Sequence, residues 1–249
     1  MSVMTRFHSG VNRALRPVGV QVVRGFSSDA AVQSFLPARR TLAAAERAGL
    51  SLTDYIDQFS AKPGATTAAV KEMLALADLS APVDRVCEIG PGTGRYAEKV
   101  ISALHPEVYE AYETARDWLP HLSKLPSVKL HEADGRTLAQ TASGSVDLVH
   151  AHKLFVYVPL VTTVGYLWEM ARVVRPGGAV AFDIVTEDCM DEPTTSTWVS
   201  EGVTLYSMVP RQWTIDLLDR KGLNLVGSTL VPMSGGRTEL LVFRKREQP

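Results

Sequence analysis

The sequence predicts an α/β protein with a seven-stranded, mostly parallel sheet, helices on both faces and a helical N-terminal extension. Three observations support this fold class. Strand-like and helix-like segments alternate after residue 80, the last two strand-like segments lie too close together for a helical crossover, and glycines follow the first segment. The chain has 249 residues, 45% of them hydrophobic, which is enough to bury one large core.

Residues 1–80 are expected to form the helical extension and cap, and residues 81–249 the α/β domain. Within the extension, helical signals appear at 36–50, directly after Ser51, and at 65–79. Ser51 followed by Asp54 resembles a capping box, in which two side chains satisfy the first N–H groups of a helix.

The first residues are basic, since Arg6, Arg13, Arg16 and Arg24 precede the first acid, Asp29. They lack the long apolar run of a secretory signal or a transmembrane helix. Apolar residues recur here at roughly helical spacing, so we expect a helix packed on the domain or a partly ordered tail. Peripheral membrane contact through this basic segment is the alternative.

Seven segments of the domain read as strands: 85–89, 108–113, 128–133, 146–152, 179–185, 224–231 and 238–245. The expected helices between and after them are 95–104, 115–125, 164–174 and 211–222. The connection between the third and fourth strands has the least helical pattern. The last two strands should pair as an antiparallel hairpin. Pro176, Gly177 and Gly178 are expected to form a tight turn before the fifth strand.

The stretch "CEIGPGTGR" follows the first strand and carries Gly90, Gly92 and Gly94. Ligands of an open parallel sheet bind beyond the carboxyl ends of its strands, where glycines let a ligand approach the backbone. A dinucleotide fold requires its third glycine where this chain has Arg95. The carboxylate of Glu88 would repel a pyrophosphate, but it suits a ligand with a sulfonium or ammonium charge. These features indicate S-adenosylmethionine and argue against a nicotinamide oxidoreductase.

This stretch resembles motif I of the class I S-adenosylmethionine-dependent methyltransferases, which have a Rossmann-like sheet, and further landmarks follow in the same order. The resemblance implies that Glu113, at the end of the second strand, grips both ribose hydroxyls. It also implies that Asp134 accepts a hydrogen bond from the adenine amino group while the backbone N–H of Gly135 meets the ring. Glu88 and the three glycines complete the cofactor site that the resemblance implies.

The fourth strand ends in His150 and His152, and the resemblance places this end near the transferred methyl group. The Asn-Pro-Pro-Tyr motif of DNA amino-methyltransferases is absent from the sequence here. Imidazole titrates near neutral pH and can take a proton from an alcohol or phenol. Strand alternation places both rings on one face, so both reach the site or both pack beneath a helix. We favour His152 as the catalytic base, with His150 as the second candidate and a cofactor contact.

The segment after the fifth strand contains five acids: Asp183, Glu187, Asp188, Asp191 and Glu192. Some sugar O-methyltransferases of this family bind Mg²⁺ through carboxylates, and oxygen ligands suit that ion. The spacing of these acids is not diagnostic of a metal site. A solvated acidic loop is therefore favoured over Mg²⁺ binding.

Four aromatic residues are candidates for the walls of an acceptor pocket, because sugar faces and aryl rings both pack on aromatic side chains. They are Tyr55, Phe155, Trp198 and Tyr206, and core packing is the alternative for each. The overall pattern resembles bacterial methyltransferases of glycan or natural-product pathways, which implies transfer to a hydroxyl of a small polar acceptor, a sugar or glycan. A phenolic or other natural-product acceptor, and cofactor binding without turnover, remain open.

The formal net charge of -1 provides no overall field toward phosphate backbones, which argues against a nucleic-acid partner. Two cysteines, Cys87 and Cys189, are too few for a disulfide framework or a structural zinc site. The cysteine count therefore fits a reducing cytoplasm. The sequence leaves the oligomeric state and the methylated position open.

Overall fold

The structure is a computed structural model that describes residues 36–60, 62–201, 207–233 and 235–247. The helices and strands of these residues belong to one compact unit, residues 34–249. The basic N-terminal segment and Tyr206 lie outside the described residues. The division of the chain at residue 80 therefore stays a prediction.

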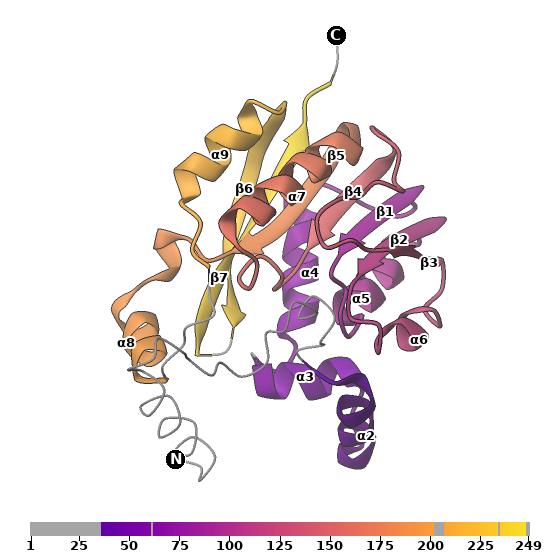
Figure 1. The fold of residues 1–249 in the computed structure, drawn as a ribbon, viewed down its shortest axis with the longest axis vertical. Helices are drawn as coiled ribbons and strands as arrows, with labels where there is room; N and C mark the ends of the chain where they lie inside the picture. The colour runs from indigo at the N-terminus through magenta and orange to yellow at the C-terminus, as the bar shows by residue number, and fades with distance from the viewer. Residues whose placement is uncertain (1–35, 61, 202–206, 234, 248–249) are drawn as a thin grey trace, which may run out of the picture. The chain divides into compact units, whose positions relative to one another are not determined.

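The described strands form one sheet in the order β3-β2-β1-β4-β5-β7-β6 (Figure 1). Their bounds are Arg85–Ile89 for β1, Val108–Glu113 for β2, Val128–Glu132 for β3, Val146–Ala151 for β4, Val174–Ile184 for β5, Leu223–Met233 for β6 and Gly236–Lys245 for β7. The pairs from β3 to β5 are parallel, whereas β7 runs antiparallel to β5 and β6. The predicted seven-stranded sheet with its C-terminal antiparallel hairpin is confirmed.

The helices mostly occupy the predicted segments. Their bounds are Ala38–Ala48 for α2, Leu52–Ser60 for α3, Ala65–Leu76 for α4, Arg95–Leu104 for α5, Leu119–Leu122 for α6, Leu160–Val173 for α7, Glu192–Glu201 for α8 and Arg211–Asp219 for α9, with a 3₁₀ turn, η3, at Glu187–Cys189. The helix expected at 115–125 is reduced to α6. Helix α8 is rich in Ser and Thr, which are poor helix formers, and it was not predicted.

Helices cover both faces of the sheet (Figure 1). On one face, Met73 of α4 and Val100 of α5 belong to the same core cluster as Leu148 of β4. On the other face, Leu167 of α7 packs in a second cluster with Val149 of the same strand. Adjacent residues of β4 thus point to opposite helical layers, and this strand is buried along its whole length.

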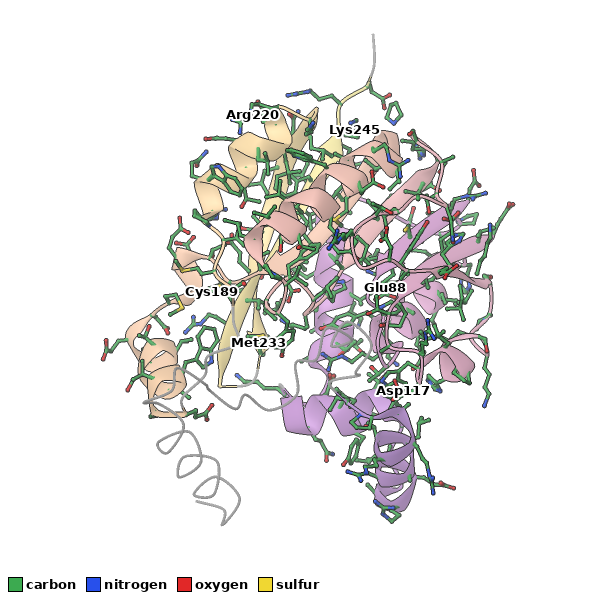
Figure 2. The ribbon with its side chains drawn as sticks, viewed as in Figure 1. Glu88, Asp117, Cys189, Arg220, Met233 and Lys245 are labelled. Carbon is green, nitrogen blue, oxygen red and sulfur yellow. The ribbon has the colours of Figure 1, made fainter. Side chains whose placement is uncertain are left out.

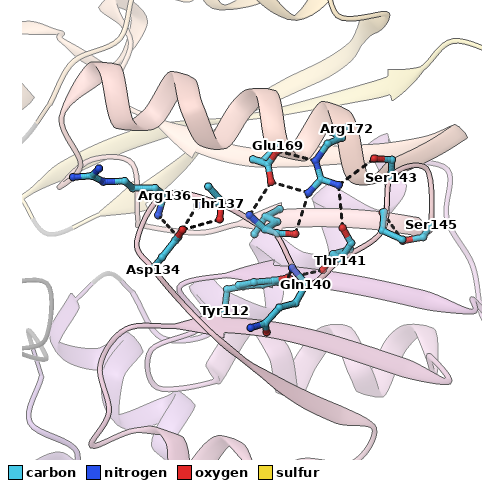
Figure 3. Close-up of polar contacts among 12 residues, drawn as sticks. Tyr112, Asp134, Arg136, Thr137, Gln140, Thr141, Ser143, Ser145, Glu169 and Arg172 are labelled. Atoms are coloured by element: carbon cyan, nitrogen blue, oxygen red, sulfur yellow. Dashed lines mark hydrogen bonds and ion pairs between the residues drawn. The ribbon is translucent and has the colours of Figure 1, made fainter.

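The connection between β3 and β4 contains no helix, and side chains of α7 hold it in place (Figure 3). Glu169 accepts a hydrogen bond from the Leu138 N–H at 2.8 Å. Arg172 donates to the carbonyls of Leu138 and Thr141, both at 3.0 Å. Because α7 satisfies these backbone groups, the segment needs no helical hydrogen bonds of its own.

Pro176, Gly177 and Gly178 lie within β5 instead of forming a separate turn before it. Val174 pairs with Val146 of β4, but the next pairing joins Ala179 to Leu148, so β5 bulges between these two positions. The expected tight turn is thus an irregularity of the strand, and it is remote from the carboxyl edge of the sheet.

Helices α2 and α3 contact the loops at the carboxyl edge of the sheet. Asp117, in the loop after β2, accepts the Ala38 N–H at 2.8 Å (Figure 2). Asp57 of α3 pairs with Arg95 at the start of α5, with 3.2 Å between Oδ1 and Nη1. At the start of α3, the Asp54 N–H donates to Ser51 Oγ at 3.1 Å, as the capping motif predicts.

Candidate functional site

The order of the strands reverses between β1 and β4, because β1 continues to β2 while β4 continues to β5. The connections that follow β1 and β4 therefore diverge, which opens a crevice beyond their carboxyl ends. Glu88 of β1 and His150 of β4 are partners in the register at this point. The residues predicted to bind the cofactor lie at the ends of β1 to β4 and in the turns that follow β1 and β3.

The glycine turn after β1 has a left-handed backbone at all three predicted positions, with φ of 65° at Gly90, 51° at Gly92 and 76° at Gly94. A Cβ atom at Gly90 would lie 3.0 Å from Leu154 Cδ1, and one at Gly94 would lie 2.9 Å from Leu122 Cδ2. At Gly92 a Cβ atom would meet no atom of the described residues within 4 Å. An added Cβ would therefore press on leucine side chains at Gly90 and Gly94, while Gly92 borders open space among the described residues.

Glu113 joins the end of β2 to the glycine turn. One carboxylate oxygen accepts the Gly92 N–H and the other accepts the Ala115 N–H, each at 2.6 Å. Burial raises the pKa of Glu113, although the hydrogen bonds from Ala115 and Gly92 lower it. Each oxygen has a further lone pair, so the carboxylate can still accept from two hydroxyl groups.

Asp134 follows β3 and is exposed at the rim. Its carboxylate accepts the N–H groups of Arg136 and Thr137, at 2.8 and 2.7 Å, and the Thr137 hydroxyl at 2.7 Å (Figure 3). Burial acts to raise its pKa, but the hydrogen bonds from Thr137 and Arg136 outweigh this effect and lower it. Gly135 has a left-handed φ of 76° and shapes the same turn. In this structure Asp134 caps the turn that it begins.

Glu88, Tyr109 and His150 form a buried network beneath the glycine turn. The Tyr109 hydroxyl lies 2.6 Å from Glu88 Oε2 and 2.9 Å from His150 Nε2. Burial raises the pKa of Glu88 to about 8, and it lowers the pKa of His150 well below its usual value. His150 is completely buried, and its Nδ1 has no hydrogen-bond partner among the described residues. The structure therefore buries His150 within this network.

His152 has a different environment, although its ring lies only 5.3 Å from that of His150, on the same side of β4 as expected. It stacks on Tyr96, the second residue of α5, with 4.0 Å between the ring centroids. Its Nε2 is buried without a partner among the described residues. Burial lowers the pKa of His152 to about 4, opposed by the nearby charge of Asp183.

Lys153, Asp183 and Thr238 form a cluster beside His152 that was not predicted as a unit. The Asp183 carboxylate accepts the backbone N–H of Lys153, the Lys153 ammonium and the Thr238 hydroxyl, each at 2.6 Å. Lys153 has a left-handed backbone, with φ of 54°, which is unusual for a residue other than glycine. The sequence suggested that Asp183 belongs to a solvated acidic loop. In the structure it lies within β5 and its side chain is buried.

Three of the other acids of that segment contact Arg211 or Arg237. Glu187 accepts the Arg211 N–H at 2.9 Å, Asp188 lies 3.5 Å from the same guanidinium, and Asp191 pairs with Arg237. Among the residues that the structure describes, no three His, Cys, Asp or Glu side chains are grouped as metal ligands. Asp188 and Asp191 thus lie in ion pairs with arginines.

Two of the candidate pocket aromatics lie in the core. Phe155 is buried with its ring 5.8 Å from that of Phe182, and Trp198 packs in a small cluster with Val156, Val185, Cys189 and Met233 (Figure 2). Tyr55 is half-buried on α3. Among the described residues, Tyr55 is therefore the remaining aromatic candidate for a pocket wall.

Residues 86–178 match the family model described as a methyltransferase domain. A search among curated proteins gave no match. Many solved structures share the fold. One is magnesium protoporphyrin IX methyltransferase from Synechocystis PCC 6803 with bound SAM, which is 10% identical with a TM-score of 0.59 over 90% of this chain and 100% of that one.

Two other similar structures are methyltransferases of different types. The N-methyltransferase NodS from Bradyrhizobium japonicum WM9 is 17% identical, with a TM-score of 0.54 over 74% of this chain and 97% of its own. An O-methyltransferase family protein from Burkholderia thailandensis is 18% identical, with a TM-score of 0.54 over 87% of this chain and 65% of its own. At these identities the likeness establishes the fold alone, and the family-model match over residues 86–178 supports the predicted resemblance to methyltransferases.

The raised pKa of Glu88 predicts a specific pH dependence of stability. Glu88 binds its proton more tightly in the folded protein, so its contribution to stability is present at low pH and is lost as the pH rises from about 4.5 to about 8. Glu88→Gln, which stays neutral, should remove this contribution to the pH dependence. Urea unfolding of both proteins from about pH 5 to about pH 9 measures the difference. Parallel stability curves would contradict the assignment.

Proposed function

Because residues 86–178 match a methyltransferase domain and the sheet has the class I fold, we propose that the protein is an S-adenosylmethionine-dependent methyltransferase. The observation that carries the proposal is the glycine turn, where Gly92 borders open space and its N–H binds the Glu113 carboxylate. Incubation with S-adenosylmethionine and a panel of acceptors, followed by mass spectrometry for the gain of one methyl group, tests the activity.

The residues at the carboxyl ends of β1 to β3 fit this cofactor. Glu113 has lone pairs for the two ribose hydroxyls, and open space at Gly92 suits the methionine part of the cofactor. Asp134 and the Gly135 N–H would meet the adenine ring. Asp134 would accept the adenine amino group beside the hydrogen bonds that it already receives. Glu88 lies beneath the turn, where ionisation of its carboxylate would favour the positive charge of the cofactor.

The bound cofactor would supply a methyl group on a sulfonium, and the protein would align the acceptor and remove its proton. We assign proton removal to His152 Nε2. The lowered pKa keeps His152 neutral near pH 7, and Nε2, which has no partner among the described residues, could offer a lone pair to the acceptor proton. Once His152 gains the proton, the charge of Asp183 stabilises the imidazolium. His150, which contacts Tyr109, has a structural role in this proposal.

The acceptor is proposed to be a hydroxyl of a small polar molecule, a sugar or glycan. This proposal rests on the sequence resemblance to glycan-pathway enzymes and on histidine as a base for alcohols. A phenolic or other natural-product acceptor fits the same base. The solved structures named above include enzymes of the N- and O-methyltransferase types, so the fold does not select among acceptors. A cytoplasmic location also stays a prediction.

Cofactor binding without turnover is the second candidate, because the burial of His150 and His152 gives both rings a packing role. The two candidates differ in one measurement. A binding protein would retain S-adenosylmethionine unchanged in the presence of every acceptor, whereas the enzyme would release S-adenosylhomocysteine.

Gly92→Ala should abolish S-adenosylmethionine binding, because the added Cβ would occupy the space assigned to the cofactor. Gly144→Ala is the matched control, since Gly144 also has positive φ, 62°, and open space around its Cβ position. Both variants experience similar backbone strain, so their melting temperatures should fall alike. Calorimetric titration should detect binding only in the control. Equal affinities would show that the ligand does not cover this turn.

Glu113→Ala should weaken S-adenosylmethionine binding by about 2 to 4 kcal/mol, the scale for losing charge-assisted hydrogen bonds. Glu107→Ala, at an exposed acid just before β2, removes the same charge away from the crevice. Calorimetry gives the dissociation constant of each variant. The difference between the two separates loss of the ribose contact from loss of one negative charge. If both bind like the wild type, Glu113 does not hold the ribose.

His152→Ala should lower kcat by roughly 10²- to 10⁴-fold and leave cofactor affinity nearly intact, as expected for loss of a positioned base. In the wild type, kcat should fall as the pH drops through the His152 pKa of about 4 and stay level above it. His150→Ala should instead lower the melting temperature with little change in turnover per folded molecule. Normal turnover by His152→Ala would direct attention to Asp183 as the alternative base.

A further inference from the structure

Helix α2 presents a basic face to solvent. Arg39, Arg40 and Arg47 are exposed, with Ala43 and Ala44 between them along the helix. At 100° per residue these positions span an arc of about 140°. The buried residues of α2, which are Ala38, Thr41 and Ala45, occupy the opposite side. The helix therefore packs on the protein through small side chains and exposes its arginines together.

These arginines border a depression of about 610 Å³. It is lined by α2 and by Tyr55 and Ile56 of α3, with Leu36 at one end, and none of the lining residues is acidic. The two alanines leave space between the longer arginine side chains. Guanidinium groups around such a space match phosphate, which they can bind through two parallel hydrogen bonds.

The arginines of α2 differ from most others in the described part of the chain. Seven arginines there form ion pairs with acids: Arg85, Arg95, Arg172, Arg175, Arg211, Arg237 and Arg246. Arg39, Arg40 and Arg47 form no ion pair with any described residue. Three neighbouring positive charges without a counterion repel one another, and an external anion would relieve that repulsion.

The sequence concentrates positive charge at the same end of the chain. Residues 1–47 contain seven arginines and two acids, Asp29 and the exposed Glu46 of α2, whereas the remainder has 19 of the 26 basic residues and 25 of the 27 acidic ones. A concentration of positive charge at one end of a sequence favours contact of that part with a negatively charged surface.

We propose that the basic face of α2 docks on an anionic lipid bilayer and that the arginine-lined depression receives phosphate head groups. A bilayer is the occupant that fits best, because the arginines extend along the exposed face of α2 instead of surrounding one closed pocket. Leu36, which is 38% exposed, and Tyr55 lie beside the arginines, and such residues settle at the membrane interface. This inference does not depend on the proposed methyl transfer.

No helix of the described residues is long and apolar enough to cross a membrane.

Co-sedimentation of the full-length protein with vesicles tests the docking. Wild type should bind vesicles that contain phosphatidylglycerol and not those of phosphatidylcholine alone, and added salt should weaken binding. Replacing Arg39, Arg40 and Arg47 together by Gln should reduce partitioning onto these vesicles by about 100-fold, because each basic residue contributes roughly 1 kcal/mol to binding of an anionic surface. Gln preserves helix propensity, and circular dichroism should show unchanged folding.

The matched control replaces Lys71, Lys129 and Arg220 by Gln, which removes the same charge from exposed positions on α4, β3 and the end of α9. Arg220 lies at the opposite end of the unit from α2 (Figure 2). The control should partition like the wild type. Equal loss in both triple variants would overturn the proposal, because binding would then follow net charge alone. The proposal would also be overturned if inorganic phosphate bound to saturation at α2 while the same protein failed to bind vesicles that contain phosphatidylglycerol.

Discussion

The Glu113 carboxylate fixes the geometry of the proposed cofactor site. By accepting the N–H groups of Gly92 and Ala115, it joins the glycine turn after β1 to the end of β2. These hydrogen bonds hold the turn in its left-handed conformation, and that conformation is accessible because the turn has glycines at 90, 92 and 94. Removal of the carboxylate would leave buried N–H groups unsatisfied, so the same side chain supports the fold and faces the ligand.

The sequence predicted the features that depend on local patterns. Strand and helix periodicity located all seven strands, and the short connection between β6 and β7 correctly indicated a hairpin. The short α6 was not predicted. The sequence showed only a weak helical pattern before β4, and distant residues decide that this segment has no helix. Arg172 and Glu169 of α7, more than 30 positions away, satisfy the backbone of Leu138. Such long-range hydrogen bonds override local propensity and leave no periodic signal.

The histidine pair shows the same limit at the level of chemistry. Strand alternation correctly placed both rings on one side of β4, but their partners come from other elements. The Tyr109 hydroxyl of β2 hydrogen-bonds one nitrogen of His150, whereas Tyr96 of α5 stacks on the His152 ring, whose Nε2 has no partner in the described part of the chain. The different tasks proposed for the two residues thus follow from the packing of α5 and β2 against β4.

The left-handed backbone of Lys153 sets thermal stability against function at a single position. A residue with a Cβ in this conformation costs about 1 kcal/mol, and glycine would remove most of that strain. Glycine would also remove the ammonium from buried Asp183, whose charge raises the pKa of His152. In a library screened only for heat resistance, glycine at position 153 would relieve backbone strain but lose the ion pair with Asp183. A library screened for turnover would retain lysine. Position 153 is therefore a poor target for stability engineering that ignores activity.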